Sequence, residues 1–199
     1  MIHLLLSLVF VFALQPTNAF AQTWDTILQK IERKPNGVSL SGLVTDAESV
    51  FSDSQDLKAK DLELFYTKLK AKANIPYDRQ LLESRLDAVK QLPELMTYDA
   101  EKLLETLEQS CDVINKLSPQ SVAHKEQSDI KMISLAADRH INSPKSSDKS
   151  LLFFIKGKAE YTISMGGLEA LEAFTDRVSE DSPKHKEALE MIRILKSQP

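Results

Sequence analysis

Apolar residues recur at every third or fourth position along most of the chain, and charged residues fill the positions between them. This spacing places the apolar side chains on one face of an α-helix, which turns once in 3.6 residues. We therefore expect an all-α fold of about nine amphipathic helices, arranged as antiparallel helical hairpins in either a repeat array or an irregular helical bundle. The clearest apolar stripes lie at positions 24–31, 40–51, 62–73, 82–89, 103–114 and 130–137.

Threonine, serine and proline residues indicate where some of these helices begin and end. Thr97 is a candidate N-cap for a long helix that stops at Leu117, and the preceding helix is expected to end near Pro93. The pairs Ser118-Pro119 and Ser182-Pro183 are typical of helix starts, because a hydroxyl group caps the helix and proline fits its first turn.

The first 21 residues have the pattern of a secretory signal peptide. An apolar run over Leu4–Leu14 is followed by Pro16 and by Ala19-Phe20-Ala21, and small residues at the first and third places of this triplet fit a signal peptidase. A membrane anchor is the alternative, but a span requires about 18 apolar residues, and this run is shorter. We expect cleavage before Gln22, which leaves one helical domain at 22–199.

The predicted export and the single cysteine together suggest where in the cell the protein is located. The chain has one cysteine, Cys111, so its 199 residues form no internal disulfide although export would permit one. Small secreted scaffolds usually carry several disulfides. We therefore expect a periplasmic or secreted protein, with the bacterial periplasm favoured.

Residues 151–165 fit two secondary structures. Alternating apolar and polar residues from Ala159 to Met165 are typical of a strand, and Lys156-Gly157-Lys158 would then be a hairpin turn. The same segment also fits a helix with two apolar faces and small residues at Gly157 and Ala159. A lone hairpin would leave two strand edges to protect in an otherwise helical chain, so we favour the helix.

Read as a helix, this segment begins a pattern of small and aromatic residues that continues to Pro183. The pattern consists of Gly157, Ala159 and Tyr161, a turn at Gly166-Gly167, then Ala170 and Phe174, then Pro183. It resembles one tetratricopeptide repeat, a family in which small residues let two helices approach closely. The helix pair would occupy about residues 151–184. A generic helical hairpin with Ala170 and Phe174 at its seam is the alternative.

The resemblance implies a role in binding another protein. Helical repeats present a concave surface to a partner and need no reactive group. We expect Ala170 and Phe174 to lie at the seam of the helix pair. Lys158 and Tyr161 are the predicted binding residues, on a face of the first helix that reaches outward toward the partner.

Charge and motifs weaken several other functions. The chain has 25 Lys and Arg against 29 Asp and Glu, a balance that argues against nucleic-acid binding. Four acidic residues follow one helix face and suggest either a cation site or a surface for a basic partner, namely Glu101, Glu105, Glu108 and Asp112. A di-metal carboxylate site also needs Glu-x-x-His pairs, which the chain lacks, so we expect a solvated face and predict no metal and no cofactor. Cys111 lies on an apolar stripe and is expected to be an inert, buried thiol.

These observations predict an exported helical protein that serves as a protein-interaction or scaffold module of the cell envelope, and not an enzyme. After signal cleavage we expect no membrane span. The alternative is a small-ligand-binding protein or an enzyme in a helical bundle, with acids such as Glu105 and Glu108 turned inward. Burial of the acidic face distinguishes the two hypotheses.

Overall fold

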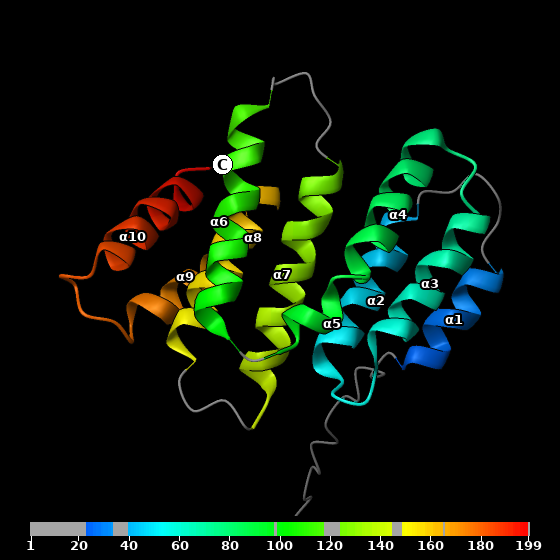
Figure 1. The fold of residues 1–199 in the computed structure, drawn as a ribbon, viewed down its shortest axis with the longest axis horizontal. Helices are drawn as coiled ribbons and strands as arrows, with labels where there is room; N and C mark the ends of the chain where they lie inside the picture. Colours follow the sequence, from blue (N-terminus) through cyan, green and yellow to red (C-terminus); the bar gives the residue numbers. More distant parts are fainter. Residues whose placement is uncertain are drawn as a thin grey trace, which may run out of the picture.

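The computed structural model describes residues 23–33, 40–97, 99–117, 124–144, 149–164 and 166–198. In this part of the chain there are ten α-helices and no strand, so the expected all-α class is confirmed (Figure 1). The helices are α1 (Trp24–Arg33), α2 (Ser41–Asp53), α3 (Ala59–Ala71), α4 (Pro76–Val89), α5 (Leu92–Leu95), α6 (Ala100–Lys116), α7 (His124–Asn142), α8 (Ser150–Ser164), α9 (Leu168–Thr175) and α10 (Pro183–Lys196). The segment that also fitted a hairpin is therefore a helix, α8.

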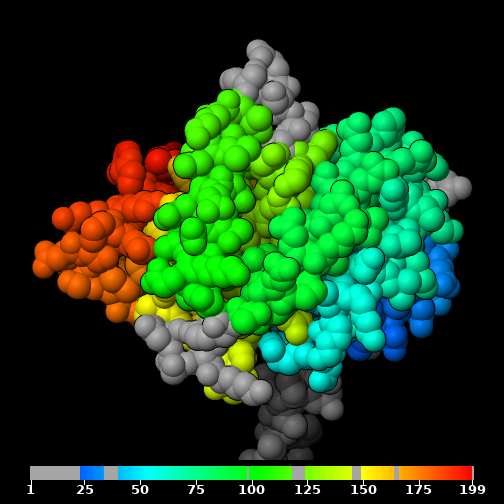
Figure 2. Space-filling model, in the orientation of Figure 1, coloured from blue at the N-terminus to red at the C-terminus, as the bar shows by residue number. Residues whose placement is uncertain are grey.

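Helix α7 lies at the centre of the arrangement. It packs against α8 and α6 on one side and against α4, α2 and α5 on the other (Figure 1). Helices α1–α4 form one end of the molecule and α8–α10 form the other, while α6 crosses the middle of the face seen in Figure 2. Buried apolar side chains from both ends join into one continuous core.

The helix boundaries follow local chemistry, with one correction. The N-cap of α6 is Asp99 and not the predicted Thr97, because the Asp99 carboxylate accepts a hydrogen bond from the Lys102 backbone N–H at 3.1 Å. Helix α6 ends at Lys116 with Leu117 as its C-cap, and α10 starts at Ser182-Pro183, as expected. The predicted start at Ser118-Pro119 and the predicted signal peptide lie outside the described residues.

The end formed by α1–α4 contains a buried ionic cluster that joins four helices. The Glu48 carboxylate accepts a hydrogen bond from the Tyr66 hydroxyl at 2.7 Å and forms ion pairs with Arg85 at 3.2 Å and Lys131 at 3.4 Å. Burial raises the pKa of Tyr66 well above its usual value, and the negative charge of the neighbouring Glu48 raises it further. These contacts tie α2, α3, α4 and α7 together.

At the other end, small residues allow α8 and α9 to approach closely. A Cβ atom at Gly157 would lie 2.6 Å from Leu171 Cγ, and one at Gly167 would lie 2.4 Å from the Gly157 carbonyl oxygen. Gly167 also has a φ of +88°, a left-handed conformation that favours glycine. The Phe154 and Phe174 rings pack with their centroids 5.0 Å apart. The predicted closely packed helix pair is confirmed, and it is compatible with a helical-repeat-like fold.

Candidate binding site

Helices α6, α8 and α10 line an open cavity of about 530 Å³, and both predicted binding residues lie on its wall. We call it the acid-lined cavity. Lys158 and Tyr161 reach it from α8. Its lining consists of Glu108, Cys111, Asp112, Ile114, Asn115, Lys158, Tyr161, Thr162, Glu187 and Met191.

Lys158 is held inside this site by carboxylates from two other helices. Its ammonium group lies 2.8 Å from Glu187 Oε1 on α10 and 3.7 Å from Glu108 Oε1 on α6. It also lies 5.6 Å from the centre of the Phe154 ring. The Lys158 side chain is only 16% exposed, so it bridges three helices and does not extend outward as the sequence pattern suggested.

Tyr161 lies next to Lys158 on the wall of the acid-lined cavity, because residues three positions apart share a helix face. Its side chain is half-buried and packs against the hydrophobic core. No described residue forms a hydrogen bond with its hydroxyl group. A partly exposed ring with an available hydroxyl is a common contact surface for a binding partner.

The charge around the acid-lined cavity is negative. Glu108, Asp112 and Glu187 contribute three carboxylates, whereas Lys158 contributes the one cation among the described lining residues. All three carboxylate side chains are exposed. The whole acidic row on α6 faces solvent, as predicted, so Glu105 is not turned inward as the enzyme alternative required.

Cys111 lies on the floor of this cavity and is buried, as expected. Its Sγ lies 3.6 Å from Thr162 Oγ1, and the Thr162 hydroxyl donates its own proton to the Lys158 carbonyl oxygen at 2.8 Å. Burial raises the pKa of Cys111 and outweighs the opposing effects of Thr162 and Lys158. The protonated thiol contributes packing to this site and is not an activated nucleophile.

The described histidines lie apart from one another. His185 contacts the Val178 carbonyl oxygen through Nδ1 at 3.1 Å, and the His124 ring packs against Tyr77 with centroids 4.9 Å apart. In the part of the chain that the structure describes, no three His, Cys, Asp or Glu side chains gather in a way that could hold a metal ion. No helix in the same part combines the length and the apolar character needed to cross a membrane.

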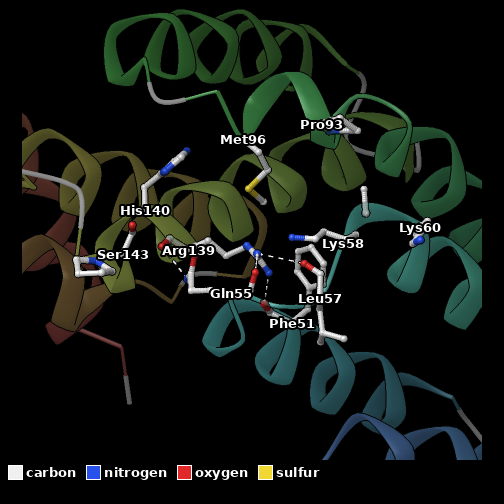
Figure 3. A pocket seen from close by; sticks show the side chains of 12 residues that line it. Phe51, Gln55, Leu57, Lys58, Lys60, Pro93, Met96, Arg139, His140 and Ser143 are labelled. Carbon is white, nitrogen blue, oxygen red and sulfur yellow. Dashed lines mark hydrogen bonds between the residues drawn. The ribbon is translucent and has the colours of Figure 1, made fainter.

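A larger cavity, of about 920 Å³, lies where α2, α3, α5 and α7 meet (Figure 3). Its lining comes from the segments 51–60, 93–96 and 139–144. The sequence analysis missed this cavity because no local pattern relates segments so far apart in the chain. The available signal was weak: Lys58 and Lys60 stand at the start of a helix, where cations are unfavourable.

Comparison with protein-family models, with curated proteins and with solved structures finds no match for the chain.

Proposed function

We propose that this protein is an interaction module that binds a basic, partly apolar segment of another protein in the acid-lined cavity. The observation that carries the proposal is the excess of carboxylates over cations around Tyr161 and Met191. Acidic lining favours Lys or Arg on the partner, and the apolar residues accommodate a neighbouring side chain. We further propose that α8 and α9 are a tetratricopeptide-like pair, whose family binds peptides in grooves between helices.

A basic partner would replace Lys158 as the counter-ion of the carboxylates in this cavity. An arriving guanidinium group can take over the contacts of Glu187 and Glu108 that Lys158 now occupies, and it can stack on the face of Tyr161. Because these carboxylates are partly exposed, each exchange contributes only about 0–1 kcal/mol. Selectivity therefore depends on several contacts made together, which suits an extended peptide segment.

Binding fits the chemistry of this cavity better than catalysis does. Cys111 is buried and protonated, and no histidine lines the cavity to activate it. The lining carboxylates face solvent, where they attract a cation without the desolvation that tunes a catalytic acid or base. We propose that the protein is not an enzyme.

The proposed location is the cell envelope, reached through cleavage of the predicted signal peptide. Amino-terminal sequencing of the exported protein tests this part, and we expect Gln22 as the first residue. An intact Met1 in the membrane fraction would contradict it.

Site-specific cross-linking tests the binding surface. We expect a photo-reactive amino acid at Tyr161 to capture a defined partner in cells, whereas the same group at exposed Leu64 does not. Reversing two charges of the site, with Asp112→Lys and Glu187→Lys, should abolish the capture. Reversing two exposed acids outside the cavity, Glu101→Lys and Glu180→Lys, is the matched control and should leave it intact. Equal capture by both double variants would contradict the proposal.

A further inference from the structure

The larger cavity has an apolar interior. It is bounded by the end of α2, the start of α3, the short helix α5 and the end of α7 (Figure 3). Six of its lining residues are apolar, namely Phe51, Leu57, Ala59, Pro93, Met96 and Pro144. Met96 projects into the space from α5 (Figure 3). Such a surface favours a hydrocarbon group over water.

Among the described residues that line this cavity, the charged groups are all cations. Lys58, Lys60 and Arg139 line it together with His140, and its described lining residues include no Asp or Glu. Lys58 and Lys60 are exposed, and no described carboxylate forms an ion pair with either side chain. The nearby Asp61 carboxylate instead accepts a hydrogen bond from the Lys58 backbone N–H at 2.7 Å. We call this space the cation-lined cavity.

Arg139 forms its rigid floor. The guanidinium group donates hydrogen bonds to the carbonyl oxygens of Phe51 at 2.7 Å and Ser54 at 2.6 Å, and also to those of Gln55 and Leu57 at 3.3 and 3.2 Å. It also stacks 4.5 Å from the centre of the Phe51 ring. These contacts satisfy carbonyl groups at the C-terminus of α2 and fix the α2–α3 connection. Arg139 therefore shapes the site, while the two lysines remain available to a ligand.

We infer that the cation-lined cavity binds a small amphipathic anion: a free carboxylic acid with a linear hydrocarbon chain. The apolar interior takes the chain, and Lys58 and Lys60 take the carboxylate at the mouth. The volume of about 920 Å³ lies within the usual range for small-ligand sites, roughly 300–1,000 Å³, and the apolar half of the lining provides a surface for the hydrocarbon chain.

This site is separate from the acid-lined cavity, and its lining shares no residue with it. A carboxylate would find only like charges at the acid-lined cavity, apart from Lys158. The inference therefore stands or falls independently of the proposed protein partner.

Three ligands with the same hydrocarbon chain and different head groups test the inference by titration calorimetry, with the ionic probes below their micelle concentrations and the alcohol below its solubility limit. The probes are dodecanoate, dodecanol and dodecyltrimethylammonium. We expect dodecanoate to bind about tenfold more tightly than dodecanol, as two partly exposed ion pairs would give, and the cationic probe to bind most weakly. Equal affinity for all three, or no binding of dodecanoate, would overturn the inference.

Charge-reversal variants assign the effect to the cavity. Lys58→Glu with Lys60→Glu should remove the preference for dodecanoate over dodecanol. Lys72→Glu with Lys116→Glu makes the same charge change at exposed positions outside the lining and should retain the preference. If the first pair unfolds the protein, Lys58→Gln with Lys60→Gln replaces it with the same expectation. An unchanged preference in the lysine variants would overturn the inference.

A space-filling variant tests the apolar part. Met96→Trp inserts a large ring into the cavity and leaves its charges unchanged, so it should weaken binding of dodecanoate and dodecanol alike. Retention of full dodecanoate affinity by Met96→Trp would place the ligand elsewhere and overturn the inference. If an acidic apolar peptide displaces dodecanoate and binds with higher affinity than dodecanoate does, the cavity is a peptide site. That result would likewise overturn the inference.

Discussion

The acid-lined and cation-lined cavities differ in whether the protein already supplies a counter-ion. In the first, Lys158 sits between Glu108 and Glu187, so a basic ligand must compete with an internal ammonium group. In the second, Lys58 and Lys60 have no acidic partner among the described lining residues. An anion gains these contacts without breaking any ion pair. We therefore expect the cation-lined cavity to bind small ligands readily, and the acid-lined cavity to need a ligand with several contacts.

The walls of the two cavities are also held in different ways. Arg139 fixes the cation-lined cavity through charge-assisted hydrogen bonds to backbone carbonyls. The close approach of Gly157 to Gly167 instead holds α9 against α8, the helix that contributes Lys158 and Tyr161 to the acid-lined cavity. A polar substitution and a steric substitution should therefore damage different ends of the molecule.

Replacing Arg139 should have the largest effect. Arg139→Met leaves buried carbonyl oxygens without donors, and we expect the free energy of unfolding to fall by about 3–5 kcal/mol. Arg139→Lys keeps the charge but not the planar set of donors, so it should lose less. Urea denaturation measures both variants. A loss below about 1 kcal/mol for Arg139→Met would show that the guanidinium group does not hold the α2–α3 connection.

Adding one methyl group at Gly157 should have the next largest effect. Gly157→Ala brings a Cβ to 2.6 Å from Leu171 Cγ and 3.1 Å from the Leu171 backbone nitrogen, so α8 and α9 must separate. Overpacking of this kind costs about 1–3 kcal/mol.

Gly42→Ala is the matched control, because a Cβ there meets nothing within 4 Å. The same change in α2 should be neutral or stabilise the protein by up to about 1 kcal/mol. If thermal melts show the two alanine variants to be equally stable, the close α8–α9 contact is not a source of stability.

Reversing the charge of Lys158 should have a smaller effect. The sequence pattern placed Lys158 on an outward face, where substitution would change stability by under about 0.5 kcal/mol. Lys158→Glu instead places a third carboxylate beside Glu108 and Glu187, and we expect a loss of about 1–2 kcal/mol. Lys158→Gln, which adds no negative charge, should lose less. Equal melting temperatures for the parent protein, Lys158→Glu and Lys158→Gln would show that the ion pairs of Lys158 contribute little to stability.

A pH dependence at His140 should be the smallest effect. Burial lowers the pKa of His140 from the usual 6.5, so the unfolded chain binds a proton at higher pH than the folded chain does. The stability that neutral His140 provides is therefore complete above pH 6.5, and it is lost as the pH falls from 6.5 through the lowered pKa of the folded state. Urea denaturation at several pH values should show a shallower decline for His140→Gln. An identical decline in both proteins would contradict a lowered pKa.

The sequence predicted local structure well, because helix periodicity and glycine spacing are local signals. Gly157 and Ala159 indicated a close helix pair, and the spacing of acidic residues at three and four positions indicated the solvated acidic face of α6. The surroundings of each helix face were harder to predict. The periodicity of α8 placed Lys158 on one face but did not show that α6 and α10 cover that face. Thr97 was also predicted as the N-cap of α6, whereas the structure uses Asp99, which lies two residues further along and has an equally suitable side chain.

The polar contacts that depend on tertiary structure were not predictable. Arg139 lies 82–88 positions from the carbonyl groups it binds, and Glu48 joins residues from three other helices. Neither residue carries a motif that indicates such partners. The cation-lined cavity was missed for the same reason.

One measurement tests most directly whether the two cavities select opposite charges. Amide chemical shifts of one isotope-labelled sample are recorded while a short peptide of alternating Arg and Leu residues is added, and separately while dodecanoate is added. We predict that the peptide perturbs Asn115, Thr162 and Glu187, whereas dodecanoate perturbs Gln55, Lys60 and Ser143. Perturbation of the same residues by both ligands, or of neither group by either ligand, would contradict the account.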